Sequence, residues 1–163
     1  MRQKSYDRQA SVNYAKKWAY ARNPQYYDFE RIGGDCTNFA SQCIFEGSKT
    51  MNYNLNGWYY KNANNRAPSW TGVEYLYKFL VNNKHIGPYG KNSDISEIEE
   101  GDIAQLSFNN NVFSHSLIIV KILNKNLDNI LVATHTYDSL NRPISTYNFQ
   151  QIRFIHIENI RIF

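Results

Sequence analysis

The spacing of apolar residues changes near residue 100, and this change restricts the folds open to the chain more than any other feature. Before it, Val12, Ala15 and Ala19 share one face of a predicted helix over residues 6–22. After it, apolar residues alternate along four predicted strands, over residues 103–108, 112–123, 130–137 and 152–163. Helices that precede strands joined by short turns predict an α+β fold with an antiparallel sheet.

The length and composition restrict the class of protein. A chain of 163 residues fits a single domain over residues 1–163 with a sizeable core. No run of about 18 apolar residues is present, so we expect no membrane span. The net charge is +4, but the basic residues form no dense stripe, which argues against a nucleic-acid partner. The basic start over residues 1–7 leads into no apolar segment, so no secretory signal is expected.

The segment Gly33–Ile44 reads as a glycine turn that runs directly into a buried helix. Asp35 is a good N-cap, because its carboxylate can accept from unpaired amides of the first turn. Cys36 then begins the apolar face of the helix. The helix dipole stabilises a thiolate there and lowers the pKa of the cysteine, while the negative Asp35 offsets part of that effect. We therefore expect a reactive thiol whose decisive partner is a histidine cation.

The sequence also indicates where helices begin and end. The helix that starts at Cys36 is expected to run to about Phe45, with Gly47 as its terminator. Another helix is expected to start at Thr71, because Thr71 and Glu74 match a capping box. The buried stripe of this second helix consists of Val73, Leu76, Phe79 and Leu80.

The two cysteines are expected to be free thiols. On one helix, the Cα atoms of Cys36 and Cys43 would lie about 10 Å apart. A disulfide needs less than about 7 Å between Cα atoms, and zinc ligands normally lie two to four residues apart. We expect Cys43, two turns into the helix, to be a core residue.

A thiol nucleophile needs a base and a third group that orients the base. His115 stands at the start of a strongly apolar strand, and His135 lies on the next strand. With a hairpin turn near residue 126, cross-strand positions sum to about 252, so His115 would oppose Tyr137. A bulge of one residue would bring His135 to the required side, and Asp138 competes for the same role. We expect the remaining candidates to be structural, namely His85, His156 and Asp102.

Residues 48–68 lack periodicity and are rich in Asn and aromatic residues, Trp58 among them. A loop of this length is usually functional or disordered, and its large rings argue against disorder. The loop either lines a groove or is held by its own aromatic residues and touches no ligand.

Four segments together carry a resemblance to a known family: Gly33–Gln42, Gly101–Ile103, Ser114–Ser116 and His135–Thr136. In this order they resemble the putative amidase domain of Gram-positive, often spore-forming, bacteria. That family is a branch of the papain-like cell-wall hydrolases, alongside the cysteine- and histidine-dependent amidohydrolase-peptidase domains. The resemblance implies a papain-like fold without a cofactor, in which the nucleophile begins a central helix packed on an antiparallel sheet.

Carried over by position, the resemblance implies that Cys36 is the nucleophile and His115 the general base. The third polar residue lies on the strand after the histidine strand in these families, and His135 fits this position best. In some relatives an upstream tyrosine helps to form the oxyanion site, a role open to Tyr26 or Tyr27.

The implied reaction is hydrolysis of an amide bond through a thioester, in peptidoglycan or a related cell-wall peptide. The sequence does not separate a muramoyl-alanine amidase from an endopeptidase of the stem peptide. We expect four residues to contact the substrate: Tyr27, Asp35, Trp58 and Trp70. The protein is expected to be a monomer. It would be extracellular, in the cell wall or associated with the spore if a signal was trimmed, and otherwise cytoplasmic.

Two other functions compete with this hypothesis. A non-catalytic binding module on the same fold would bind glycan or peptide with the aromatic residues of the loop 48–68, and it would need no activated thiol. A metal site would use Cys36, His115 and His135 as ligands, which the resemblance to thiol hydrolases disfavours.

Overall fold

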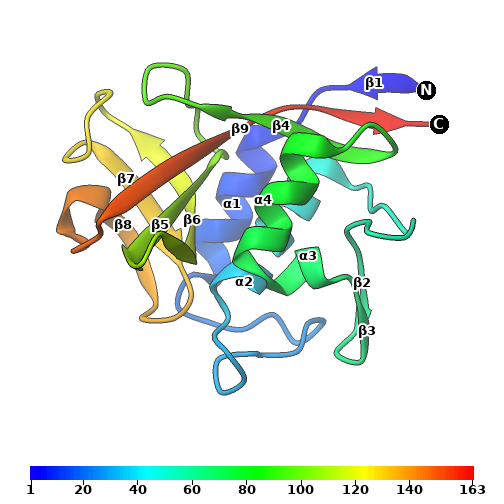
Figure 1. Cartoon of the computed structure of the whole chain (residues 1–163), viewed down its shortest axis with the longest axis horizontal. Coiled ribbons are helices and arrows are strands. Elements are labelled where there is room, and N and C mark those ends of the chain that lie inside the picture. Colours follow the sequence, from blue (N-terminus) through cyan, green and yellow to red (C-terminus); the bar gives the residue numbers. More distant parts are fainter.

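A seven-stranded antiparallel sheet with helices packed against it makes up the computed structural model, which describes residues 1–163 (Figure 1). The strand order is β1-β9-β5-β6-β7-β8, and β4 also pairs with β9. The helices are α1 (Arg8–Trp18), α2 (Cys36–Ser48), α3 (Pro68–Thr71) and α4 (Val73–Asn82). The strands of the sheet are β1 (Arg2–Lys4), β4 (Gly87–Ser93), β5 (Ile103–Asn109), β6 (Val112–Ile122), β7 (Ile130–Thr134), β8 (Ser139–Pro143) and β9 (Gln151–Ile162). A two-stranded ribbon, β2 (Tyr60–Asn62) with β3 (Asn65–Arg66), lies in the long loop, and a 3₁₀ turn, η1, spans Ile144–Thr146.

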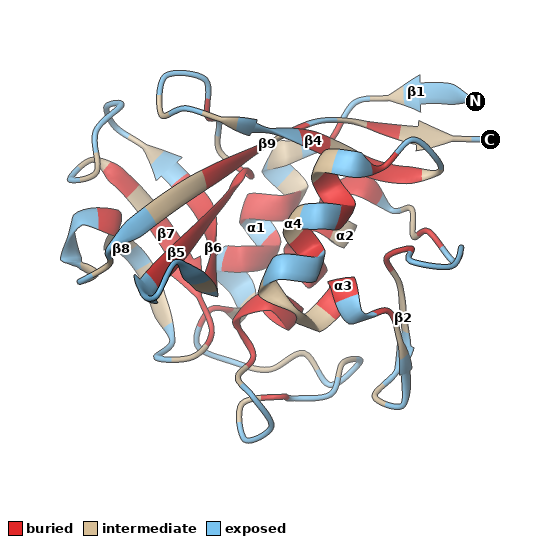
Figure 2. Ribbon diagram, in the orientation of Figure 1, coloured by how far each residue is buried: buried red, intermediate tan, exposed pale blue.

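The predicted α+β class and antiparallel sheet are confirmed, and two apolar cores explain why the sheet forms. The first core lies between the helices and one face of the sheet, with Ile118 and Val120 of β6 among its members. The second lies on the other face, where Leu117 and Ile119 pack with Phe154. Alternation along β6 therefore places successive residues in different cores. Figure 2 shows the resulting buried band along the sheet and the inner helix faces. No helix is both long and apolar enough to cross a bilayer.

The β6–β7 hairpin has nearly the predicted register. Ile122 pairs with Ile130, and beyond a bulge between Ile119 and Lys121 the pairing shifts by one residue, so that Ile118 faces Ala133. Strand β7 ends at Thr134, three residues earlier than predicted. It ends there because Thr136 and Tyr137 adopt left-handed backbone angles, with φ of 61° and 59°, that belong to a turn.

Several expected helix ends differ in the structure. Asp35 is the N-cap residue of α2 but makes no side-chain capping bond, because its carboxylate has other partners. Helix α2 continues through Gly47 to Ser48, and a Cβ at position 47 would overlap the ring of Tyr6. The glycine is therefore needed for close packing rather than for termination.

The expected capping box at Thr71 is wrong. Thr71 ends the short helix α3, and α4 begins at Val73 after Gly72 without a side-chain cap. The predicted stripe of α4 is otherwise buried, with Leu76 and Leu80 fully so, and Val73 is only partly covered.

Asp102 orders the turn before β5, as expected, and also links distant segments. Its fully buried carboxylate accepts from the Glu99 amide, and it forms an ion pair with Arg8 at 2.7 Å. His156 Nδ1 lies 2.8 Å from the same carboxylate, and this hydrogen bond raises the pKa of His156. His156 is therefore a half-buried partner of Asp102, in the structural role that the sequence predicts.

Candidate active site

Cys36 is the first residue of α2, and only 8% of its surface is exposed. The helix start is bound to β6 through the Thr37 and Ser116 hydroxyls, whose oxygens lie 2.9 Å apart. Ser116 follows His115 on β6. One side-chain hydrogen bond thus joins the immediate neighbours of the predicted nucleophile and base, which lie 79 residues apart.

The electrostatics of Cys36 differ from the sequence-based expectation. Burial raises the pKa of the Cys36 thiol, while hydrogen bonding from the Ser116 backbone and from Thr37 lowers it in part, and the Asp35 carboxylate raises it. Desolvation outweighs these hydrogen bonds, so Cys36 rests as a protonated thiol. Cys43 is a fully buried core residue, and both cysteines are free, as predicted.

His115 is also buried, at 7% exposure, and lies at the rim of the second core, 5.8 Å from Tyr147 between ring centroids. Burial and the positive charge of Arg142 lower the pKa of His115 to about 4, so the ring is a neutral imidazole rather than the expected cation. Its Nε2 atom lies 3.5 Å from the Thr134 hydroxyl. No hydrogen bond joins the thiol of Cys36 to either ring nitrogen of His115, and the link between the two residues runs through Thr37 and Ser116.

His135 is not brought together with His115. Its Nδ1 lies 2.5 Å from the Asp35 carboxylate, its Nε2 lies 2.8 Å from the Trp18 carbonyl oxygen, and its ring stacks on Phe39. Both ring nitrogens are therefore occupied, and the ring is almost fully buried. This geometry fits a residue that holds the loop before Cys36, rather than the residue that orients His115.

The loop before Cys36 is also bound to the turn after β7. The Asp35 amide donates to the Thr136 hydroxyl at 3.0 Å, and the Thr136 amide donates to Glu30 at 3.1 Å. Asp138, the other candidate for the third catalytic position, instead accepts two hydrogen bonds from Arg22. The turn after β7 thus holds the start of α2 in place, through the contacts of His135 and Thr136 with Asp35.

Comparison with known proteins assigns the chain to a protein family. The model of the family described as "Putative amidase domain" matches residues 5–157. The chain belongs to this family. It is also similar to the uncharacterized protein YhbB of Bacillus subtilis (strain 168), with 33% identity over 138 residues. The aligned part is 82% of this chain and 42% of YhbB, so the chain spans less than half of that relative. No solved structure matches.

Two residues of this amidase domain beside His115 were missed by the sequence analysis. The Tyr147 hydroxyl is buried and has no hydrogen-bond partner. Burial raises the pKa of Tyr147, the charge of Arg142 and the approach of the Ser139 and Arg142 side chains to the hydroxyl lower it, and the proximity of Cys36 raises it again, although neither side chain has the geometry of a hydrogen bond. Arg142 lies over the Tyr147 ring, 3.7 Å from its centroid. A lone tyrosine after a short strand gives no sequence signal, because only the fold brings it to β6.

The residues predicted to bind substrate have different environments in this amidase domain. Trp58 and Trp70 are fully buried with ring centroids 4.7 Å apart, so they pack the core and present no face to a ligand. The Asp35 carboxylate is buried too, and it accepts from the Phe29 amide as well as facing His135. Tyr27 alone is exposed, at 45%.

The long loop after α2 is thus partly held by its own aromatic residues, as one of the two alternatives states. No three side chains of His, Cys, Asp or Glu are grouped as metal ligands. Cys36, His115 and His135, the ligands of the alternative metal hypothesis, do not converge on one point, because His135 is bound to Asp35 and Trp18.

Proposed function

We propose that this domain is a cysteine-dependent amide hydrolase with a papain-like arrangement, acting on peptidoglycan or a related cell-wall peptide. The observation that carries the proposal is the position of Cys36 at the start of α2, beside the segment of β6 that contains His115 and Ser116. The description of the family as an amidase supports amide bonds as the substrate class. A thiol nucleophile needs an adjacent general base, and His115 on the neighbouring strand is the base we propose.

In this proposal the resting pair is neutral, and proton transfer accompanies attack. The Thr134 hydroxyl accepts from Nε2–H of His115, which leaves Nδ1 with a free lone pair. Substrate binding brings Nδ1 and the thiol of Cys36 into contact, as catalytic hydrogen bonds often tighten only in the complex. Nδ1 takes the thiol proton while the sulfur attacks the amide carbonyl carbon.

The oxyanion formed by attack needs donors. The backbone N–H of Cys36 is one of the amides that a helix start leaves unpaired, and it is the first donor we propose. The Tyr147 hydroxyl, buried and without a partner, is the second donor we propose. His115 then protonates the leaving amine, and the C–N bond breaks to leave a thioester. Water, deprotonated by the same imidazole, hydrolyses the thioester and restores the thiol.

His135 has a positioning role in this scheme. It holds Asp35, and Asp35 directly precedes the nucleophile. The pair therefore fixes where the helix start and its free amides lie, without touching the reacting atoms. Thr134 takes the orienting role that the sequence analysis gives to His135.

The test is digestion of purified peptidoglycan, with released fragments identified by mass spectrometry. The wild-type domain is expected to release whole stem peptides if it cleaves the muramoyl-alanine bond, or fragments of stems if it cleaves within the stem peptide. The products therefore identify which amide bond is the substrate. Cys36→Ala and His115→Ala are each expected to abolish release while keeping the native circular dichroism spectrum. Cys43→Ala is the matched control, since it removes the other thiol, and it is expected to retain activity.

Two outcomes would contradict the proposal. Unchanged turnover in Cys36→Ala would exclude a cysteine nucleophile. Binding of peptidoglycan without any release by the wild-type protein would favour the non-catalytic binding module. A second measurement uses iodoacetamide at neutral pH, which should label Cys36 before Cys43, because Cys43 is fully buried and Cys36 is not.

A further inference from the structure

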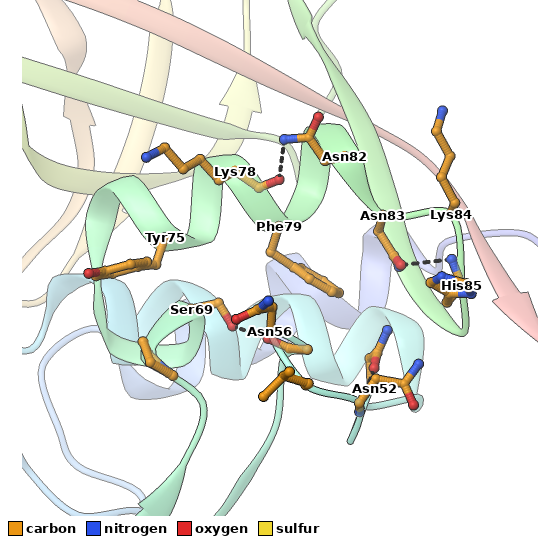
Figure 3. A pocket seen from close by; sticks show the side chains of 14 residues that line it. Asn52, Asn56, Ser69, Tyr75, Lys78, Phe79, Asn82, Asn83, Lys84 and His85 are labelled. Carbon is orange, nitrogen blue, oxygen red and sulfur yellow. Dashed lines mark hydrogen bonds between the residues drawn. The ribbon is translucent and has the colours of Figure 1, made fainter.

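A cavity of about 500 Å³ lies between α4 and residues 52–57, and we propose that it binds a sugar that carries a carboxylate or a phosphate (Figure 3). The proposal does not depend on the chemistry of Cys36. Asn52 lies just beyond the C-terminal end of α2, whereas Cys36 begins that helix, about 18 Å away along its axis. None of the lining residues is Cys36, His115, Thr134 or Tyr147, so the cavity is a second site.

The walls of the cavity are held firmly. Asn52 and Trp58 exchange two backbone hydrogen bonds of 2.8 and 2.7 Å, which close the loop between them into a tight hairpin. A Cβ at Gly57 would overlap the backbone oxygen of Asn52, so the hairpin requires glycine there. On the opposite wall, the Asn83 side chain donates to the Pro88 carbonyl and accepts from the His85 amide. A ligand would therefore meet a preformed site.

Several polar groups that line the cavity have no partner within the protein. Five of the fourteen lining residues are asparagines. The side chains of Asn52, Asn82 and Asn83 are used in internal hydrogen bonds. Those of Asn54 and Asn56 are exposed and form no hydrogen bond in the structure. A carboxamide both donates and accepts, which suits the hydroxyl and acetamido groups of a sugar.

The charge of the lining is one-sided. Lys78 and Lys84 are the cationic side chains of the cavity, and none of its lining residues is Asp or Glu. Neither lysine takes part in an ion pair with the protein, and both are exposed. An ammonium group without an internal partner is available to a carboxylate or phosphate of a ligand. This charge favours an anionic ligand over a neutral one.

Aromatic surface completes the site. Phe79 lines the cavity from α4 but is buried and stacks on Trp58, with 6.0 Å between ring centroids. The exposed ring is Tyr75, which lies at the end opposite Lys84 and His85 (Figure 3). The apolar face of a sugar ring packs well on such a ring, while its edges reach the amides. The arrangement predicts that the sugar lies against Tyr75 with its acidic group toward a lysine.

The test is titration of the ¹⁵N-labelled full chain with two matched pairs of sugars at millimolar concentrations. N-acetylmuramic acid is compared with N-acetylglucosamine, which lacks the carboxylate, and glucose 6-phosphate is compared with glucose. At least one acidic sugar is expected to shift amide signals of residues 52–57 and 75–85, and more strongly than its neutral counterpart. The stronger acid of the two identifies the anionic group that the site prefers.

A double variant tests the role of the lysines. Lys78→Gln/Lys84→Gln is expected to weaken binding of the preferred acid about tenfold, the effect of losing a charge-assisted hydrogen bond. The matched control is Lys16→Gln/Lys121→Gln, which removes two exposed lysines elsewhere and should leave the affinity unchanged. Equal shifts by acidic and neutral sugars, or no shift of residues 52–57 and 75–85 with any of them, would overturn the proposal. An equal loss of affinity in both double variants would also overturn it, since general surface charge would then explain the binding.

Discussion

His135 and Asp35, one hundred residues apart in the chain, form a buried pair with 2.5 Å between Nδ1 and the carboxylate oxygen. The Trp18 carbonyl can only accept, so Nε2 of His135 carries the hydrogen of that contact and Nδ1 faces Asp35. The pair connects the turn after β7 with the residue before the candidate nucleophile.

We predict that Asp35→Asn lowers the free energy of unfolding by about 3–5 kcal/mol, because it leaves one partner of a buried charged pair uncompensated. Chemical denaturation measures this change. Glu46→Gln is the control, since it breaks only an exposed pair with Lys49 and should cost about 0–1 kcal/mol. If the two variants lose similar amounts of unfolding free energy, the buried pair contributes no more to stability than the exposed pair.

The pH dependence of hydrolysis is expected to report on His115. The proposed base must be neutral to take the thiol proton, and the pKa of about 4 for His115 means that kcat/KM stays high until the pH falls toward about 4. Arg142→Gln removes the second cause of the lowered pKa, so the acid limb should move to higher pH while staying below 6.5, because burial remains. The control Arg31→Gln, at an exposed position, should not move it. An acid limb near 6.5 in the wild-type enzyme would contradict this account.

The same shift of His115 affects stability. Its pKa is lower in the folded than in the unfolded chain, so between about pH 6.5 and 4 the unfolded chain binds the proton first. The contribution of His115 therefore makes the fold less stable as the pH falls through this window. In His115→Phe this part of the pH dependence should disappear from denaturation curves measured across the same range.

Thr134 is predicted to position His115. Its hydroxyl is fully buried and lies 3.5 Å from Nε2 and 3.1 Å from the Ser116 carbonyl oxygen. Thr134→Val should lower kcat about fivefold to tenfold with little change in KM, as expected for the loss of one orienting hydrogen bond. Thr134→Ser keeps the hydroxyl and should restore most of kcat. A valine variant with raised KM and unchanged kcat would argue for a structural role only.

The variant Tyr147→Phe distinguishes a catalytic role of the Tyr147 hydroxyl from a structural one. A buried hydroxyl without a partner costs stability, so its removal should leave the unfolding free energy unchanged or raise it by about 1 kcal/mol. If the hydroxyl donates to the oxyanion, kcat/KM should nevertheless fall by about tenfold or more. Higher stability together with full activity would remove Tyr147 from the mechanism.

Local patterns were sufficient to predict much of the fold. The apolar alternation of β5, β6 and β9 and the helical face of α2 are properties of short segments, and the structure has these elements near the expected positions. Strand β4 was missed because Gly87, Pro88 and Gly90 give it no alternation. It is a strand because β9 offers a free edge, which is a property of the assembled sheet.

The candidate site was predictable only in part, for two physical reasons. The sign of the Cys36 pKa shift depends on how much protein covers the thiol, and local sequence shows the helix start but not its cover. The one-residue bulge that would bring His135 toward His115 is present in β6. Strand β7 nevertheless ends at Thr134, and the left-handed turn that follows leaves the His135 ring bound to Asp35.

The close approach of Gly34 to Thr136 couples two loops that are far apart in the sequence. A side chain at position 34 would meet the Thr136 hydroxyl at 3.0 Å, and that hydroxyl also receives the amide of Asp35. Insertions or exchanges in either loop alone would displace the thiol. Laboratory recombination of this domain with its relatives should therefore succeed when residues 28–36 and 134–139 come from the same parent, and fail when they are drawn from different ones.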